Sequence, residues 1–329
     1  MRPFLYQRPA DRAAAEHAIL AENASILGGG TTLLDLMKLD AMRPDVVVDI
    51  NDLAPGAAGI DASAGGLHLS AFVTMAETAA HPDILRDYPV IAQSLQLAAS
   101  PQIRNMARLG GNVLQRTRCS YFRDGWTACN KRSPGSGCAA LDGVNRKHAV
   151  LGTSDSCIAT YPGDFAQALV ALDALIEITS ERGPRNIRFA ELHRLPDDTP
   201  HLETTLAPGE MITGFFVPAG AWTRRSKYLK IRDRESYEFA LASAAVALDL
   251  DGTVVRQARI ALGGVATKPW RSAEAEAVLV GKPVSEANAH AAAEAAFAGA
   301  KARSGNGYKI ELGRQTLVRA VIETAALQV

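Results

Sequence analysis

Four cysteines are the residues best suited to chemistry in this sequence of 329 residues. They are the only cysteines of the chain and follow one another as Cys119-x9-Cys129-x8-Cys138-x18-Cys157. Structural zinc sites usually pair their ligands through two to four intervening residues, and this stretch has no such pair. Disulfides would need an oxidising compartment and would not explain the clustering. Four thiolates on a long irregular loop suit a [4Fe–4S] cluster, while zinc, disulfides and free thiols stay open from spacing alone.

The stretch around the cysteines is also rich in basic residues, namely Arg116, Arg118, Arg123, Lys131 and Arg132. Their charges would offset the negative charge of a thiolate-ligated cluster, or they would form a docking surface. His148 lies in the same stretch. Because four cysteines are available as ligands, we expect His148 to be a surface residue.

A glycine-rich segment, "SILGGGTTLLDLMK", is the second feature with chemical potential. It places Gly28 to Thr32 between a strand-like and a helix-like run, without the lysine of a P-loop or the G-x-G-x-x-G spacing of a dinucleotide site. Glycines let the backbone approach a pyrophosphate closely, and N–H groups at a helix start bind anions. A purely structural strand-to-helix turn is the alternative.

A second segment, "LGGNV" at residues 109–113, is predicted to be a turn of the same type. It follows a predicted helix that carries Gln102, Arg104 and Asn105. Two turns rich in donors indicate one extended ligand bridged between them. Asp164 stands where a further helix begins, so it is either an N-cap or a carboxylate that accepts hydrogen bonds from a ribose or adenine.

The elements that must position these residues alternate between helix and strand. Periodicity predicts a helix, a strand, a second helix and a second strand over residues 11–50, and then a strand that leads into a helix capped by Thr74. A helix from residue 88 is stopped near Ser100-Pro101. Residues 108–160 show no sustained period, which indicates a loop held by something other than secondary structure.

The remaining chain predicts a small sheet covered by helices. A helix and a strand follow at residues 162–178, and a domain boundary falls within residues 215–230. Two strand runs meet at Asp251-Gly252, a strong hairpin signal. Three helical patterns complete the chain at residues 271–281, 285–302 and 311–327.

Composition excludes two function classes. Lysine plus arginine equals aspartate plus glutamate at 35 each, so the formal net charge of +0 shows no basic excess for nucleic acid. No apolar run reaches the roughly 20 residues of a spanning helix, so we expect no membrane insertion. The N-terminus has no signal-peptide pattern, so the chain by itself should stay in the cytoplasm.

Four segments together resemble the FAD-binding (medium) subunit of molybdenum hydroxylases of the xanthine dehydrogenase family. They are "ILGGGTTLLDLMK", "SPQIRNMARLGGNVLQ", "DFAQALVALDALI" and "ALGGVATKPWRSAEAEAVLVG". The stretch "RTRCSYFRDGWTACNKRSPGSGCAALDGVNRKHAVLG" narrows the resemblance to the flavin subunit of bacterial, periplasmic-type aldehyde oxidoreductases, which carries an additional [4Fe–4S] cluster. The flavin subunits of 4-hydroxybenzoyl-CoA reductase, which also has a cluster-bearing insertion, and of xanthine dehydrogenase are the alternatives.

The resemblance implies an α+β fold in two parts. A vanillyl-alcohol-oxidase-type FAD-binding domain with two α/β subdomains would span residues 1–222 and carry the cysteine-rich loop at about residues 115–160. A CO-dehydrogenase-flavoprotein-like C-terminal domain, a small antiparallel sheet plus helices, would span residues 223–329.

The resemblance also implies site residues. The pyrophosphate loop would be Ile26, Leu27, Gly28, Gly29, Gly30, Thr31, Thr32, Leu33 and Leu34. The positions that line the flavin would be Arg108, Gly111, Asn112 and Gln115. Asp164 would be an adenosine-side carboxylate, and Ile212 and Lys230 would lie near the isoalloxazine ring, with a core aliphatic and a surface lysine as their alternatives. The cluster ligands would be Cys119, Cys129, Cys138 and Cys157.

In such an enzyme the chain is an electron-transfer subunit of a heterotrimer. A large subunit with a molybdenum cofactor would oxidise an aldehyde to a carboxylic acid. Electrons would pass through [2Fe–2S] clusters of a small subunit to FAD and on to an external acceptor, so we expect no catalytic acid–base residues here. Export folded with a partner that bears a twin-arginine signal would make the chain periplasmic. The rival interpretations are a stand-alone FAD oxidoreductase and a non-enzymatic module with structural zinc.

Overall fold

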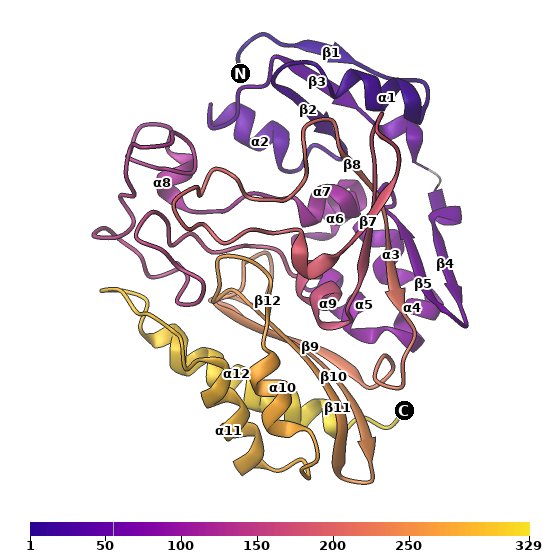
Figure 1. Cartoon of the computed structure of the whole chain (residues 1–329), viewed down its shortest axis with the longest axis vertical. Helices are drawn as coiled ribbons and strands as arrows, with labels where there is room; N and C mark the ends of the chain where they lie inside the picture. Colours follow the sequence, from indigo (N-terminus) through magenta and orange to yellow (C-terminus); the bar gives the residue numbers. More distant parts are fainter. Residues whose placement is uncertain (55) are drawn as a thin grey trace.

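The computed structural model describes residues 1–54 and 56–329, which form three β-sheets with helices packed around them (Figure 1). The first two sheets come from the N-terminal two thirds of the chain, and the third begins at residue 226. Helices and sheets are mixed in each part, and the third sheet is antiparallel. The α+β fold class is therefore confirmed.

The first sheet is parallel, with strand order β1-β3-β2. Its strands are β1 (Leu5–Gln7), β2 (Ala24–Leu27) and β3 (Val46–Asp49). Parallel neighbours need a crossover, and α1 (Arg12–Ala18) and α2 (Leu33–Lys38) provide it. The predicted alternation of helix and strand over residues 11–50 is confirmed, with shorter helices than the pattern indicated.

The second sheet has five antiparallel strands in the order β4-β5-β8-β6-β7. The strands are β4 (Ile60–Ser63), β5 (Gly66–Ser70), β6 (Leu175–Thr179), β7 (Arg185–Arg188) and β8 (Met211–Pro218). The accompanying helices are α3 (Met75–Ala80), α4 (Pro82–Asp87), α5 (Pro89–Gln96), α6 (Pro101–Met106), α7 (Leu109–Val113) and α9 (Phe165–Ala171).

Two predicted helix boundaries are confirmed in this part. Thr74 accepts a hydrogen bond from the Glu77 N–H, while the Glu77 carboxylate accepts one from the Thr74 N–H, which completes a capping box. The break near Ser100-Pro101 separates α5 from α6, and Ser100 caps α6 by accepting from the Ile103 N–H.

The third sheet is antiparallel, with strand order β12-β11-β10-β9. Its strands are β9 (Ser226–Ile231), β10 (Ala242–Asp251), β11 (Val254–Gly263) and β12 (Trp270–Arg271). The predicted hairpin joins β10 to β11, with Gly252 at a φ of +60°. The helices α10 (Ala273–Leu279), α11 (Glu286–Ala296) and α12 (Tyr308–Ala325) cover one face (Figure 1).

The other face of the third sheet closes the core of the preceding part. Ala245, Ala247 and Ala261 belong to the same buried cluster as Phe165 and Leu169 of α9. Because both faces are covered, the first seven residues of β10 are all buried instead of alternating. The change of sheet falls between β8 and β9, and the domain boundary after residue 222 stays a prediction.

The cysteine-rich loop, residues 115–160, lies between α2 and the start of α12 (Figure 1). Its one regular element within the described residues is α8 (Ser120–Arg123). Side-chain hydrogen bonds, in place of helix or sheet hydrogen bonds, hold most of the loop. Arg132 donates to the carbonyls of Tyr121 and Phe122, at 2.6 and 2.8 Å, and also to that of Thr127.

The other basic side chains of the loop are paired with acids. Arg116 and Lys131 bind Glu203, at 2.6 and 3.3 Å, and Arg118 and Arg123 bind Asp35, at 3.1 and 2.8 Å. The five basic side chains are only 12% to 26% exposed. These side chains therefore hold the loop in place, and their role as a docking surface stays a prediction.

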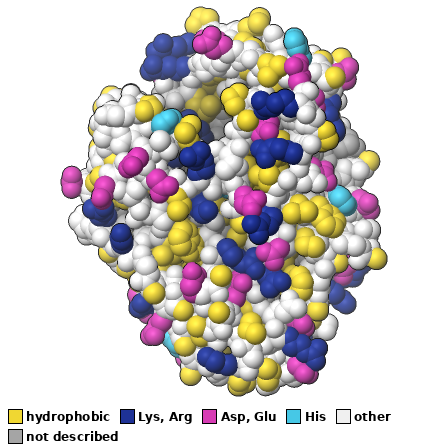
Figure 2. All heavy atoms as spheres, viewed as in Figure 1, with side chains coloured by type: hydrophobic (Ala, Val, Ile, Leu, Met, Phe, Trp, Pro, Cys, Tyr) yellow, Lys and Arg dark blue, Asp and Glu magenta, His cyan; other side chains and the backbone are white. Residues whose placement is uncertain are grey.

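Surface charge follows the balanced composition. Figure 2 shows acidic and basic side chains interspersed over the visible face. Among residues 1–54 and 56–329, no helix is both long enough and apolar enough to cross a membrane.

Candidate functional site

The glycine loop, residues 28–32, is the turn between β2 and α2. A Cβ on Gly29 would overlap the carbonyl of Met106, and one on Gly28 would come within 3.1 Å of the Arg108 side chain. Gly30 has a φ of +73°, which side chains disfavour. The loop is therefore bare because the segment that leads into α7 packs directly on it.

The prediction that "LGGNV" is a second turn is wrong, since these residues form the short helix α7. Arg108 occupies its N-cap position. Gly110 lets the helix pack on Ala71, because a Cβ there would lie 3.0 Å from the Ala71 Cβ. A Cβ on Gly111 would meet nothing within 4 Å, so this glycine leaves open space.

A hydrogen-bond network ties the two glycine segments together. The Arg108 guanidinium donates to Asn51 Oδ1, at 3.2 and 3.3 Å, and to the Phe72 carbonyl at 3.0 Å. Asn51 Nδ2 in turn donates to the Gly28 carbonyl at 2.9 Å and to Asp49 at 2.7 Å. The sequence reasoning missed Asn51. Its place just after a parallel strand, where ligand sites of such sheets lie, was the available signal.

Two cavities open on either side of Thr31 and Thr32, which line both of them. The first, which we call the glycine cavity, has a volume of about 530 Å³. Its walls include the site residues Ile26, Gly28, Gly29, Gly30, Leu33, Arg108, Gly111 and Ile212. The second, which we call the lysine cavity, has a volume of about 540 Å³, and its walls include Asn112, Gln115, Asp164 and Lys230. The predicted Leu27 and Leu34 side chains pack in the small core against Leu33 and Met37.

A buried ion pair stands in the wall of the lysine cavity. Lys230 Nζ lies 2.8 Å from Asp164 Oδ2, and the two side chains are 1% and 4% exposed. Lys230 also donates to the Leu97 carbonyl at 3.0 Å, and Tyr228 donates its hydroxyl to Asp164 at 2.6 Å. Burial raises the pKa of Tyr228 well above its ordinary value, so the hydroxyl stays a donor. The carboxylate thus accepts from both Lys230 and Tyr228, and the two charges of the pair offset each other.

These contacts decide one of the sequence alternatives, that of Lys230. The surface-lysine interpretation of Lys230 is wrong. Asp164 does occupy the N-cap position of α9, but its side chain makes no capping hydrogen bond. Ile212 is buried and lines the glycine cavity, whereas Lys230 lines the lysine cavity beside Asp164. That Ile212 and Lys230 lie near the isoalloxazine ring and Asp164 on the adenosine side stays a prediction.

The lysine cavity also contains an unsatisfied acceptor. Asn112 Nδ2 contacts the Met75 sulfur at 3.3 Å. The backbone carbonyl of Asn112 accepts a hydrogen bond from the side-chain amide of Gln115 at 2.9 Å. Asn112 Oδ1 is buried, and within the described part of the chain it has no hydrogen-bond partner. Together with the open space at Gly111, this acceptor fits a site that a polar, elongated ligand would fill.

The four cysteines converge in the folded chain. All of them line one narrow cavity of about 10 Å³, close to the room that a single water needs, and all are free thiols. Burial raises the pKa of Cys119 to about 12 and that of Cys157 to about 11. Over residues 1–54 and 56–329, no group of three or more His, Cys, Asp or Glu side chains is placed to hold a metal ion.

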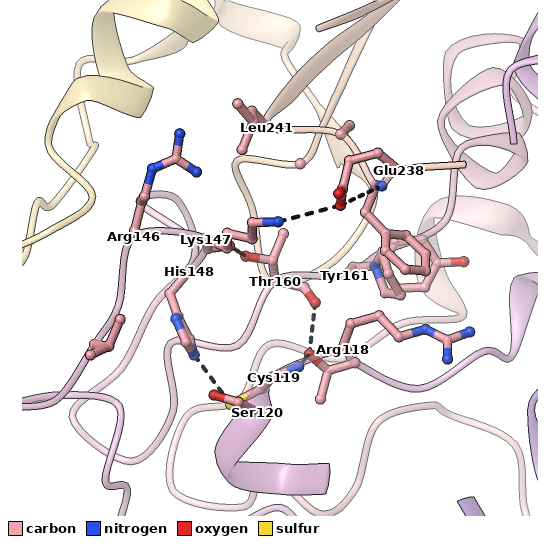
Figure 3. A pocket seen from close by; sticks show the side chains of 16 residues that line it. Arg118, Cys119, Ser120, Arg146, Lys147, His148, Thr160, Tyr161, Glu238 and Leu241 are labelled. Carbon is pink, nitrogen blue, oxygen red and sulfur yellow. Dashed lines mark hydrogen bonds and ion pairs between the residues drawn. The ribbon is translucent and has the colours of Figure 1, made fainter. Parts of the chain in front are cut away.

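The expectation that His148 is a surface residue is wrong. It is 6% exposed, and its Nε2 lies 3.2 Å from the sulfur of Cys119 (Figure 3). Burial lowers the pKa of His148 to about 4, so the ring is neutral near pH 7. Both residues line a pocket of about 400 Å³. The sequence contained no signal for this contact, because 29 positions separate the two residues in the chain.

Two family models match consecutive parts of the chain. Residues 2–220 match the FAD-binding domain in molybdopterin dehydrogenase, and residues 227–324 match the CO dehydrogenase flavoprotein C-terminal domain.

Known proteins are similar over the same length. The chain is 44% identical to the aldehyde oxidoreductase FAD-binding subunit PaoB of Escherichia coli (strain K12), and the match covers 99% of each chain. It is 27% identical to the carbon monoxide dehydrogenase medium chain of Afipia carboxidovorans, over 84% of this chain and 80% of that one. A crystal structure of the Cu,Mo-CO dehydrogenase superimposes with a TM-score of 0.75 at 25% identity, over 99% of both chains.

Proposed function

The chain belongs to the family of FAD-binding subunits of molybdopterin dehydrogenases, as the sequence resemblance indicated, and we propose that it holds FAD as the electron-transfer subunit of a molybdenum-dependent aldehyde oxidoreductase. The observation that carries the proposal is the pair of cavities that meet at Thr31 and Thr32. A dinucleotide is a two-part ligand joined by a pyrophosphate. The choice of an aldehyde as substrate rests on the 44% identity to PaoB over the full length.

The residues around the two cavities suit this ligand. The bare backbone of the glycine loop would approach the pyrophosphate, with N–H groups and threonine hydroxyls as donors. Gly111 would leave room beside it, because a Cβ there meets nothing within 4 Å. Asn112 Oδ1 would accept a hydrogen bond that no residue among 1–54 and 56–329 supplies. When bound, FAD supplies the exchange between one- and two-electron chemistry, and the protein tunes it by hydrogen bonds and charge.

The cysteine-rich loop would hold a [4Fe–4S] cluster through Cys119, Cys129, Cys138 and Cys157. The donor set is suitable, because all four side chains are free thiols that line one cavity. A cubane binds each thiolate at a different corner, so the sulfurs need not meet at one point as they do around a zinc ion. The cavity of about 10 Å³ is too narrow for a cluster, so the thiols would move outward and lose their protons on binding. The cluster supplies one-electron chemistry when bound.

The partners follow from the same proposal. A large subunit with a molybdenum cofactor would oxidise the aldehyde, and a small subunit with [2Fe–2S] clusters would pass electrons to FAD in a heterotrimer. An external acceptor would then take the electrons from this chain. Co-export with a partner that bears a twin-arginine signal would place the assembly in the periplasm. Without such a partner it would stay in the cytoplasm.

The first experiment measures cofactor content. The complex is purified without oxygen, and flavin, iron, acid-labile sulfide and zinc are determined per chain. We expect one FAD and, in this chain, four iron and four sulfide beyond those of the small subunit. Zinc in place of iron would identify a structural zinc module. Aldehyde oxidation by the isolated chain would identify a stand-alone oxidoreductase.

A matched pair of variants tests the FAD cavities. Gly111→Leu would fill open space at the glycine cavity, and we expect at least a tenfold loss of bound flavin with the fold retained. Gly299→Leu is the control, because a Cβ there also meets nothing within 4 Å, far from either cavity. Equal flavin content in the two variants would contradict FAD binding at this site.

A further inference from the structure

Cys119 has an imidazole against its sulfur. His148 Nε2 lies 3.2 Å from Cys119 Sγ, which is within hydrogen-bonding reach of sulfur. Figure 3 shows the imidazole directed at this sulfur, across the start of α8. The Cys157 sulfur instead accepts a backbone hydrogen bond from the Ala159 N–H at 3.4 Å. The sulfurs thus differ in the donors that face them.

The direction of the Cys119 hydrogen bond depends on the state of the sulfur. A thiol donates its own proton or accepts one from the ring. A thiolate that ligates iron has no proton, so any hydrogen bond at this contact must be donated by Nε2–H. That conclusion is independent of whether the second ring nitrogen also carries a proton.

The backbone around His148 is held by the C-terminal domain. Asn306 donates to the Ala149 carbonyl at 2.9 Å and to the His148 carbonyl at 3.5 Å. The buried Lys309, in the first turn of α12, donates to the Lys147 carbonyl at 3.1 Å. The Gly305 N–H donates to Asn145 Oδ1 at 2.8 Å. These bonds fix the backbone from which the imidazole reaches the sulfur.

Cys119 and His148 both line the pocket of about 400 Å³ in Figure 3, and Cys119 also lines the cysteine cavity. This sulfur is therefore placed between the interior of the loop and an open pocket. A hydrogen bond at this sulfur would affect the reduction potential of a cluster, since hydrogen bonds to cluster sulfurs and solvent exposure both change it.

From these contacts we propose that His148 donates a hydrogen bond from Nε2 to the Cys119 sulfur and thereby raises the reduction potential of the cluster. The inference rests on the proposed [4Fe–4S] cluster. Reduction adds one electron from an external reductant and breaks no bond. A donor at the sulfur stabilises the more negative, reduced form more than the oxidised form. Removing the donor therefore makes the cluster harder to reduce.

The test compares three variants of the whole complex. His148→Phe removes the donor and keeps a ring of similar size, and His148→Gln keeps an N–H donor. Thr160→Val is the control. The Thr160 hydroxyl lines the same pocket, but it donates to the Lys147 carbonyl and not to Cys119. Each complex is titrated with dithionite and redox mediators, and the reduced cluster is followed by electron paramagnetic resonance, with iron and sulfide measured alongside.

For His148→Phe we expect the preference for the reduced form to fall about tenfold, which for one electron corresponds to a midpoint potential about 59 mV lower. His148→Gln should recover part of the shift, and Thr160→Val should show none. If His148→Phe loses iron while His148→Gln retains it, the need for a donor is also supported.

An unchanged potential in His148→Phe with full iron content would overturn the inference and leave the proposed function intact. Equal loss of iron in both His148 variants would also overturn it, since a packing role of His148 would then account for the loss without any hydrogen bond. A wild-type complex without iron and sulfide beyond the small subunit would remove the cluster itself, and with it this inference.

Discussion

The glycine loop opens on cavities of about 530 and 540 Å³, whereas the four cysteines surround only about 10 Å³. The first region is built from regular elements: the turn after β2, the helix α7 and the strand β9. The second is a loop in which α8 is the one regular element among the described residues. Backbone hydrogen bonds of regular elements frame the two larger cavities, whereas closely packed side chains fill most of the space between the cysteines.

The two regions also differ in what holds them together. The wall of the lysine cavity contains a buried ion pair with every charge satisfied. The cysteine-rich loop depends on arginine side chains that donate to its carbonyls and on contacts from the C-terminal domain. If the comparison is right, damage to the ion pair or the glycine loop should be costly, and damage to the thiols should leave the flavin region unchanged.

The largest expected effect is that of Lys230→Met. The substitution leaves the Asp164 carboxylate buried without its cation, and breaking such a pair costs about 3–5 kcal/mol of unfolding free energy. Denaturant unfolding measures the loss. Lys227→Met on the same strand is the control, because Lys227 is 28% exposed and its pair with Glu323 should contribute less than about 1 kcal/mol. Similar losses in both variants would show that burial of the pair carries no special weight.

Next in size is Gly29→Ala. The new Cβ would overlap the Met106 carbonyl, which belongs to the backbone and has little room to shift. We expect a loss of about 2–3 kcal/mol in unfolding free energy together with loss of bound flavin. Gly111→Ala is the comparison within the same site, since its Cβ meets nothing within 4 Å and should not destabilise the chain. A stable, flavin-loaded Gly29→Ala protein would contradict the close packing of the two glycine segments.

A smaller effect is expected from pH, through Lys309, which holds the cysteine-rich loop by donating to the Lys147 carbonyl. Burial lowers the pKa of Lys309 to about 7, against an ordinary value of 10.5. Between these values the unfolded chain keeps a proton that the folded chain has lost, so the free energy of unfolding rises with pH. The contribution is about 2 kcal/mol between pH 7 and pH 9 and is flat below pH 7.

Lys309→Met should remove this part of the pH dependence while keeping most of the side-chain packing. Thermal unfolding at several pH values between 7 and 9 measures the difference between the two slopes. Lys301→Met serves as a control, because the Lys301 side chain is exposed while its backbone N–H donates to the Val150 carbonyl of the same loop region. Parallel pH profiles for wild type and Lys309→Met would show that this lysine titrates normally.

The smallest effect on the flavin region should come from replacing all four cysteines with serine. We expect complete loss of the proposed cluster iron and no change in flavin per chain, because none of the four cysteines lines the glycine or lysine cavity. Flavin absorbance and iron analysis on the same sample measure both quantities. A proportional fall in flavin would mean that the two regions are not independent.

Elements with local signals were predictable from the sequence. The capping box at Thr74, the break before α6 and the hairpin at Asp251-Gly252 each depend on residues within a few positions of one another. The "LGGNV" segment misled for the opposite reason. Two glycines indicate a turn by propensity, but packing of Gly110 on Ala71 favours a helix there.

The site was predicted unevenly. The glycine loop and the four cysteines were recognisable by residue type and clustering. Asn51 and His148 were not, because their roles come from partners that are 57 and 29 positions away, Arg108 and Cys119. Asp164 was recognised from its place at a helix start and Lys230 only by resemblance, and their mutual pairing was not foreseen.

By itself the sequence determined most of the order of helices and strands, the bare loop before α2, the set of thiols and the resemblance to a family. These depend on residue type and short spacing, which the linear order contains. Only the tertiary structure decided which charges pair, which cavity each site residue faces, and that a histidine of the loop lies against a cysteine sulfur. Such contacts join segments that are distant in the chain, and their geometry is set by the packing of the three sheets and their helices.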